Sequence, residues 1–119
     1  MSARVVVTGL GVVAPNGVGA AAFDAALRAG RSGLRADESM RASGLACRVA
    51  GVPEGVDALA ETTFAPDLLL AMNQSHRYAA LAALEAWDDA GLPRPDGGDE
   101  VDWDSGAILG TGIGGMDTI

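Results

Sequence analysis

Two side chains in this sequence are suited to covalent or acid–base chemistry, and each residue type occurs once: Cys47 and His76. A nucleophilic cysteine needs a basic neighbour or a helix N-terminus to lower its pKa. If residues 46–50 form a short strand, Arg48 points to the opposite face from Cys47. A catalytic or metal-binding histidine needs partners, and no second histidine or cysteine lies near His76 in sequence. We therefore expect both residues to be structural, with no catalytic residue and no metal site.

Two glycine-rich segments could bring the backbone close to a ligand. Residues 9–14 (Gly-Leu-Gly-Val-Val-Ala) fit the dinucleotide pattern G-x-G-x-x-G/A. That site needs a helix to begin inside the motif, and Pro15 and Gly17 interrupt such a helix. We expect no nucleotide site there. Residues 110–115 (Gly-Thr-Gly-Ile-Gly-Gly) follow an apolar run, and the chemistry alone fits a ligand-binding turn and a strand exit packed under further structure equally well.

Charge and composition exclude several classes of partner. Eight arginines and no lysine face sixteen acidic residues, for a formal net charge of −8. Nucleic-acid binding needs a basic stripe, whereas the arginines gathered in residues 28–48 are expected on a solvated face. The acidic residues near position 100 do not follow the spacing of a calcium-binding loop; they are Asp96, Asp99, Glu100, Asp102 and Asp104. We expect no nucleic-acid partner and a solvated acidic loop.

No targeting signal is evident in the sequence. There is no uncharged apolar run of about 18 residues, so we expect no membrane span. The first residues do not form a secretory signal peptide, and a single cysteine fits a reducing compartment. These features predict a cytoplasmic protein.

The elements that must position these residues can be read from hydrophobic patterning. Residues 4–9 predict a strand buried on both faces, residues 10–19 a loop, and residues 20–29 a helix that ends at Gly30. Residues 31–65 are irregular, with the possible strand at 46–50. Residues 93–104 predict a polar loop, and residues 106–110 a buried strand that runs into the glycine-rich turn. This order of strands and helices predicts an α/β fold.

The best-defined element is a helix over residues 75–90, ended by Gly91 and Pro93. Its charged residues share one narrow arc, and alanines fill most of the rest of the circle; the charged residues are Arg77, Glu85, Asp88 and Asp89. A stripe this narrow predicts a mostly buried helix, and the alanines would let neighbouring backbones approach closely. Because only four residues follow the glycine-rich turn, we expect residues 1–119 to be an incomplete part of a larger domain that folds poorly alone.

Three segments in the right order resemble the β-ketoacyl-acyl-carrier-protein synthases, the condensing enzymes of fatty acid and type II polyketide synthesis. They are residues 5–17 (Val-Val-Val-Thr-Gly-Leu-Gly-Val-Val-Ala-Pro-Asn-Gly), 23–33 (Phe-Asp-Ala-Ala-Leu-Arg-Ala-Gly-Arg-Ser-Gly) and 107–116 (Ala-Ile-Leu-Gly-Thr-Gly-Ile-Gly-Gly-Met). Order and spacing agree across essentially all 119 residues. As a set the match is specific to this family.

The resemblance implies a thiolase-like fold of alternating helix and mixed-sheet layers, with this chain as the first part of its N-terminal half and residues 75–90 in the middle layer. It implies acyl transfer to a cysteine and then decarboxylative Claisen condensation with a malonyl thioester. The family's nucleophilic cysteine and two histidines lie beyond this chain, and Cys47 and His76 do not match them. A glycine-rich turn matches the family's substrate-binding turn at Thr111, Gly112, Ile113 and Gly114, with Ile113 at an isoleucine that lines the acyl channel. The implied partners are an acyl carrier protein bearing acyl or malonyl phosphopantetheine, a second synthase subunit and the rest of the synthase polypeptide, with no cofactor.

The sequence also departs from the catalytic members of the family. Many of these carry a basic residue and Met-Asp before the central helix, whereas residues 68–73 (Leu-Leu-Leu-Ala-Met-Asn) carry no positive charge. This puts carrier-protein docking at that point in doubt. Residues 14–17 (Ala-Pro-Asn-Gly) and 75–77 (Ser-His-Arg) are similar to chain-length factors, which lack the nucleophile. An active synthase, a chain-length-factor-like subunit of a ketosynthase heterodimer, and an unrelated α/β domain therefore remain as alternatives.

Overall fold

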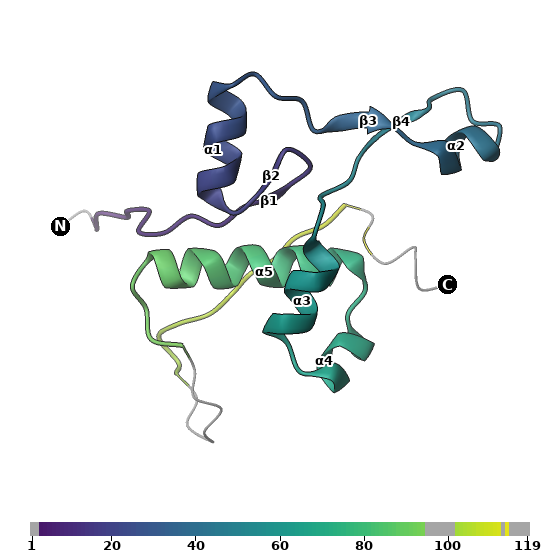
Figure 1. Cartoon of the computed structure of the whole chain (residues 1–119). Coiled ribbons are helices and arrows are strands. Elements are labelled where there is room, and N and C mark those ends of the chain that lie inside the picture. The colour runs from purple at the N-terminus through teal and green to yellow at the C-terminus, as the bar shows by residue number, and fades with distance from the viewer. Residues whose placement is uncertain (1–2, 95–101, 113, 115–119) are drawn as a thin grey trace.

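The computed structural model describes residues 3–94, 102–112 and 114. Short strands and helices alternate along the first half of the chain, and helices follow (Figure 1). The elements are β1 (Val13–Ala14), β2 (Gly17–Val18), α1 (Ala20–Arg28), β3 (Leu34–Ala36), α2 (Glu38–Ala42), β4 (Val49–Gly51), α3 (Val56–Thr63), α4 (Pro66–Ala71) and α5 (Gln74–Asp89).

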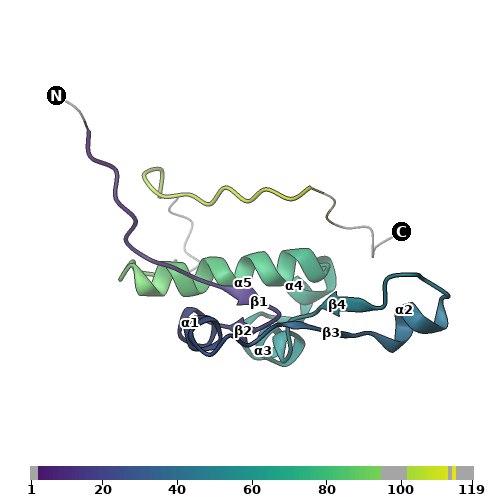
Figure 2. The ribbon, with the colours of Figure 1, turned by 90° about the horizontal axis from the view of Figure 1, so that it is seen from above.

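The described strands form two small antiparallel sheets. β1 and β2 make a hairpin in which Val13 lies opposite Val18. β3 and β4 pair with Leu34 opposite Gly51, and α2 connects them in an arm that extends away from the other helices (Figure 2). The expected mixture of helices and strands is therefore present, in the form of these two short antiparallel pairs.

Both predicted helices are confirmed close to their predicted bounds. α1 ends where Gly30 adopts a φ of 62°, and α5 ends where Gly91 adopts a φ of 68°. Glycine accepts this left-handed conformation without strain, and it lets the next N–H groups close on the last carbonyls of the helix. At the other end of α5, the Asn73 side chain accepts a hydrogen bond from the N–H of His76 at 3.0 Å.

The core lies where α3, α5 and the hairpin meet. Val56 and Ala60 of α3 are buried against Leu81 of α5. Partly buried side chains surround these three; they are Val13, Val18, Phe64, Leu69 and Tyr78. Within the part of the chain that the structure describes, Leu81 is the only buried residue of α5, and most other residues of this helix are half-buried. The predicted mostly buried state of this helix is therefore wrong for the chain as described.

The prediction that residues 31–65 are irregular is wrong in part, because this region contains β3, α2 and α3. These elements are short, so their hydrophobic patterning is weak; a side-chain cap begins α2, whereas α3 has no side-chain cap. The Asp37 carboxylate accepts hydrogen bonds from the N–H groups of Ser39 and Met40 at the start of α2, and Gly55 precedes α3 with a left-handed backbone. The possible strand at 46–50 is observed as β4, shifted toward higher residue numbers.

The two predicted buried strands, residues 4–9 and 106–110, are also wrong. Both segments lie outside any described strand and are largely exposed; Val5 is 94% and Ile108 100% exposed. A strand needs a neighbour for its backbone N–H and C=O groups, and among the described residues no strand pairs with either segment.

The radius of gyration of 17.2 Å exceeds the ~13.5 Å expected of a compact domain of this length. No described helix has the length and apolar character needed to cross a bilayer.

Candidate functional site

A groove of about 780 Å³ runs between the N-terminal half of α5 and the glycine-rich segment. One wall comes from α5 and the two residues before it: Met72, Asn73, Ser75, His76, Tyr78, Ala79, Ala80 and Ala82. The other wall comes from Leu109, Gly110, Thr111 and Gly114, and Val13 of β1 joins the lining. Figure 2 shows the segment that contains residues 102–112 running beside α5. The lining is mainly apolar, with polar groups gathered at the start of α5, so it suits a ligand with an apolar chain.

Two of the four predicted substrate-binding residues lie in this lining. Thr111 and Gly114 contribute to the groove, and the Cβ position of Gly114 would lie 2.8 Å from the Thr111 side chain. Gly112 is described but is not among the lining residues. Ile113 lies outside the described residues. At Gly110 and Gly112 a Cβ would meet no atom within 4 Å, so the described residues leave open space at these glycines.

The other glycine-rich motif packs on α5. A Cβ at Gly11 would lie 1.9 Å from the carbonyl oxygen of Ala82, and a Cβ at Gly9 would lie 2.1 Å from that of Ala86. Two residues of extended chain span about 6.7 Å and four residues of helix about 6 Å, so successive glycines lie over successive turns of the helix. The expectation that alanines allow close backbone approach is confirmed. No helix begins in residues 9–14, and these glycines face protein backbone.

Two carboxylates of α5 accept hydrogen bonds from the backbone around and after these glycines. Glu85 accepts hydrogen bonds from the N–H groups of Val12 at 2.8 Å and Ala20 at 2.7 Å. Asp89 accepts one from the N–H of Leu10 at 2.9 Å. Sequence patterning placed both acids on a polar stripe and missed this role. One signal was available: α1 begins after Gly19, which has no side chain to cap it, so an acceptor had to come from elsewhere.

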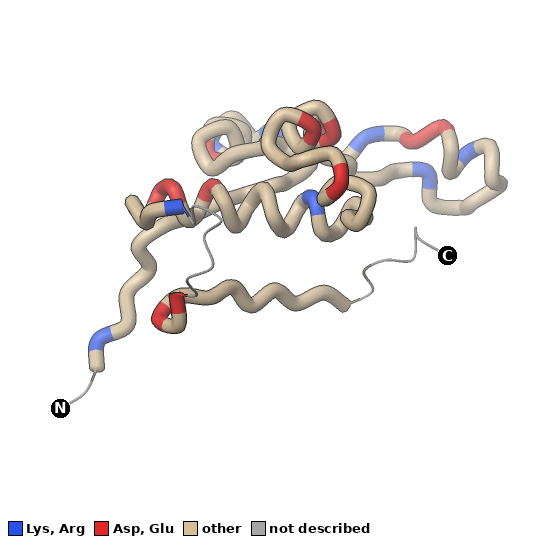
Figure 3. The backbone as a smooth tube through the Cα atoms, turned by 90° about the horizontal axis from the view of Figure 1, so that it is seen from below, with Lys and Arg blue, Asp and Glu red and all other residues tan. Residues whose placement is uncertain are grey.

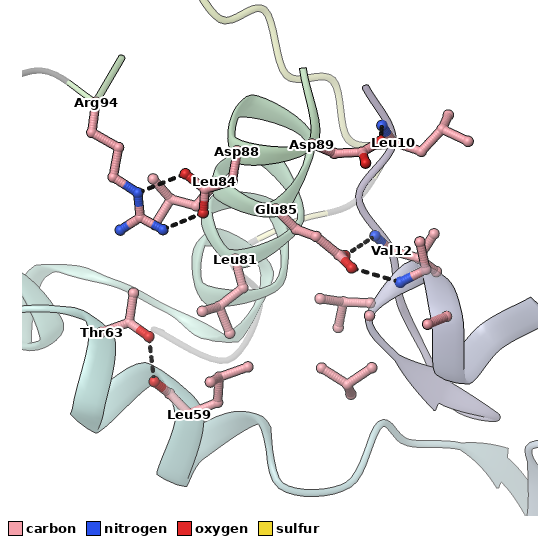
Figure 4. A pocket seen from close by; sticks show the side chains of 15 residues that line it. Leu10, Val12, Leu59, Thr63, Leu81, Leu84, Glu85, Asp88, Asp89 and Arg94 are labelled. Carbon is pink, nitrogen blue, oxygen red and sulfur yellow. Dashed lines mark hydrogen bonds and ion pairs between the residues drawn. The ribbon is translucent and has the colours of Figure 1, made fainter. Parts of the chain in front are cut away.

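A second cavity, of about 640 Å³, lies on the other side of Val13, between α3, α5 and the hairpin (Figure 4). Leu59, Leu81 and Leu84 provide apolar surface in it, and Glu85 and Asp89 reach toward Val12 and Leu10 on one side. On the other side, the Arg94 guanidinium donates to Asp88, with Nε 2.8 Å from Oδ1. This pairing lowers the pKa of Asp88. The acids of this cavity are thus already engaged by protein donors.

Cys47 and His76, which the sequence predicts to be structural residues, are both exposed in the part of the chain that the structure describes. Cys47 is exposed, and its Sγ lies 3.7 Å from the carbonyl oxygen of Val49. His76 is exposed on the first turn of α5, at the edge of the groove. Within residues 3–94, 102–112 and 114, no group of three histidine, cysteine or acidic side chains could hold a metal ion. Asp96, Asp99 and Glu100 lie outside the described residues.

The clustered arginines are exposed and interleaved with acids. Arg28 pairs with Asp24 at 2.7 Å, and Arg35 pairs with Glu54. Figure 3 shows acidic positions between the basic ones along the arm formed by β3, α2 and β4. Exposed ion pairs of this kind contribute little to the stability of the fold. The prediction that these arginines lie on a solvated face is confirmed.

Residues 2–119 match the family model described as the β-ketoacyl synthase N-terminal domain. The chain is 40% identical over 116 residues to the tetracenomycin polyketide synthase ketoacyl synthase beta subunit of Streptomyces glaucescens, with 97% of this chain and 27% of that protein covered. It is 38% identical over 122 residues to a candidate polyketide beta-ketoacyl synthase 1 of Streptomyces halstedii, with 97% of this chain and 26% of that protein covered.

A relative from a third organism gives a similar match. The chain is 32% identical over 120 residues to 3-oxoacyl-[acyl-carrier-protein] synthase 2 of Vibrio cholerae, with 98% of this chain and 27% of that protein covered. The chain therefore spans about a quarter of the length of the curated relatives it matches. The match of the family model to nearly every residue places the chain in the β-ketoacyl synthase family, in its N-terminal domain.

Proposed function

We propose that this chain is the first part of a condensing enzyme that joins an acyl thioester to a malonyl unit held by an acyl carrier protein. The observation that carries the proposal is the mainly apolar groove between α5 and residues 109–114, in a chain that belongs to the β-ketoacyl synthase family. Thr111, Gly112, Ile113 and Gly114 form the turn that contacts the acyl chain. The glycines supply open space there, as found at Gly110 and Gly112.

The complete protein adopts a thiolase-like fold, with residues 1–119 in the N-terminal half. The exposed apolar residues support this arrangement, because they offer surface for further layers. Val5, Ile108 and Leu109 are each more than 60% exposed. The half-buried alanines of α5 offer a second such surface.

The proposed reaction has two stages. A cysteine thiolate supplied by another part of the protein attacks the acyl thioester, and the carrier thiol leaves. The malonyl thioester then loses CO₂, and the resulting carbanion attacks the acyl carbon, which expels the cysteine thiolate and forms the β-ketoacyl product. The part played by this chain is to receive the acyl chain in a groove that excludes water, so that the thioester carbon is held in one place.

A second candidate is a subunit without the nucleophile that shapes the acyl tunnel of a heterodimer. The 40% identity to a protein named as a ketoacyl synthase beta subunit favours it. So does the absence of positive charge in residues 68–73, where the family resemblance implies a basic residue in many catalytic members. In this case the acyl groove is kept, and the partner subunit supplies the cysteine.

A condensation assay on the full-length protein tests the proposal. The protein is incubated with acyl and malonyl carrier protein, alone and with a ketosynthase partner subunit, and β-ketoacyl products are identified by mass spectrometry. Product formed by the protein alone supports the enzyme. Product that needs the partner, and is lost when the partner's nucleophilic cysteine is replaced by alanine, supports the second candidate. Ile113→Phe, which enlarges the side chain that the family resemblance assigns to the acyl channel, is expected to shorten the products. Absence of product under both conditions overturns both candidates.

A further inference from the structure

We propose that Glu85 is a positioning residue for the acyl groove, acting through Val13. This inference rests on the proposed function. Glu85 does not line the groove itself; it lies on α5 facing the other cavity, where its carboxylate meets the backbone of the hairpin segment (Figure 4). Val13 is the residue that connects the two sides, because it lines both cavities.

The Glu85 carboxylate accepts hydrogen bonds from both ends of the hairpin segment. One oxygen accepts from Val12, immediately before β1, and the other accepts from Ala20, the first residue of α1. The Gly19 N–H adds a bond to the carbonyl oxygen of Val12 at 2.8 Å. The chain between these points is therefore a closed loop held against α5, and Val13 is the first residue inside it.

Three features make a carboxylate suited to this position. The first N–H groups of a helix have no partner within the helix and carry positive potential, and Glu85 satisfies the one on Ala20. Gly19 leaves room for it, since a Cβ at that glycine would lie 3.3 Å from Glu85 Oε1. The Glu85 side chain is half-buried, and hydrogen bonds that backbone N–H groups donate to a carboxylate are strong in such surroundings.

Val13 has little freedom once this loop is held. Its side chain packs on the core formed by Val56, Ala60 and Leu81, and it pairs with Val18 across the hairpin. A shift of the hairpin away from α5 would carry Val13 out of the groove wall and widen the groove. Glu85 thus sets the groove's width without contact with the acyl chain.

The test compares variants of the full-length protein, assayed with its partner subunit if the assay above shows that one is needed. Glu85→Ala removes both acceptors. Glu85→Gln keeps the shape but turns an NH₂ group toward one of the two N–H donors. Asp89→Asn is the matched control, because it alters the same kind of bond on the same helix but holds Leu10, which does not line the groove. Amide exchange of residues 10–20 and kcat/KM for a long and a short acyl donor are measured for each.

We expect exchange at Val12 and Ala20 to rise roughly tenfold to a hundredfold in Glu85→Ala, and less in Glu85→Gln. The preference between long and short donors should shift by roughly threefold or more through KM, with kcat nearly unchanged; this is less than the effect of a whole methylene in such a pocket. Val13→Ala should shift the preference in the same direction. The double variant Glu85→Ala/Val13→Ala should equal Val13→Ala alone, because both act on one contact.

Unchanged donor preference in Glu85→Gln, alongside faster exchange, would overturn the positioning role and leave the proposed function standing. Equal shifts in Asp89→Asn, or additive effects in the double variant, would also overturn it. If the wild-type protein condenses no acyl donor with or without a partner, the proposed function itself fails, and the positioning role fails with it.

Discussion

The close packing of Gly11 on α5 gives the sharpest quantitative prediction for the fold. In Gly11→Ala the new methyl carbon would lie 1.9 Å from the carbonyl oxygen of Ala82 and 2.7 Å from the nitrogen of Ala86. Close C···O contacts in proteins lie near 3.3 Å, so the segment must retreat by about 1.4 Å. Both opposing atoms belong to the backbone of α5, so no side chain can turn away to make room.

The cost can be built from two parts. Insertion of a methyl group into packed structure costs about 1–3 kcal/mol. The retreat also lengthens the bond from Val12 to Glu85, now 2.8 Å, to about 4 Å, which is no longer a hydrogen bond. Loss of a bond to a charged acceptor costs about 1.5–3 kcal/mol. We therefore expect a total of about 2.5–6 kcal/mol, a large share of the 5–15 kcal/mol that holds a typical domain folded.

Thermal unfolding of the full-length protein measures this cost. At roughly 2–4 °C per kcal/mol for a domain of moderate size, Gly11→Ala should lower Tm by on the order of 10 °C. Gly44→Ala is the matched control, because a Cβ at Gly44 meets no atom within 4 Å. Gly44 has a φ of 71°, so alanine there should cost only the roughly 1–2 kcal/mol of a left-handed backbone. Equal Tm values for the two variants would refute the close approach of residues 9–11 to α5.

Two further predictions concern helix caps. Asn73→Ala removes the side chain that accepts from the N–H of His76 and should cost about 1 kcal/mol in urea unfolding; Asn73→Asp, which keeps an acceptor, should cost little, and equal losses in both variants would contradict the capping role. Hydrogen bonds from the Ser39 hydroxyl and from the N–H groups of Met40 and Ser39 lower the pKa of Asp37 from its ordinary value of 3.8. The cap at α2 should therefore be fully formed above that pH and be lost as pH falls through the lowered pKa. Amide chemical shifts of Ser39 and Met40 should report this transition in the wild type but not in Asp37→Asn, and a transition retained in the variant would contradict the assignment.

The long helices were predictable because local signals agree with the final structure. In α1 and α5, alanine-rich sequence without internal glycine or proline is followed by Gly30 and Gly91, whose left-handed backbones end the helices. Residues 4–9 and 106–110 were not predictable in this way. Their β-branched and apolar sequences favour strands, but strands form only where a neighbour supplies hydrogen bonds.

Only one wall of the candidate groove could be predicted from the sequence. Thr111 and Gly114 entered through a resemblance in sequence, and both line the groove. The opposite wall, with Ala79 and Ala80, depends on how α5 lies against a segment about 30 residues further along the chain, which no local pattern encodes. The spacing of Gly9 and Gly11 against Ala82, Ala86 and Ala90 held a usable signal, since two residues of strand match four residues of helix.

The functions of the charged residues were the hardest to foresee. Glu85 and Asp89 look like part of a solvated stripe because helical periodicity reports only which residues share a face. Their acceptors are satisfied by backbone N–H groups more than 70 residues earlier in the chain, at Val12 and Leu10. Gly19, which cannot cap α1, signals that an acceptor is needed, but backbone donors carry no signature that identifies Glu85 as that acceptor.

The proposed function requires that the groove between α5 and residues 109–114 receives an acyl chain. Photo-crosslinking tests this directly: the full-length protein, with its partner subunit if one is required, is loaded with an acyl thioester that carries a diazirine at its far end, then irradiated, digested and mapped by mass spectrometry. The account predicts labelled peptides from residues 72–82 and 109–114, and less labelling when Ala79→Phe fills the groove. Labelling confined to other parts of the protein, unchanged by Ala79→Phe, would contradict it.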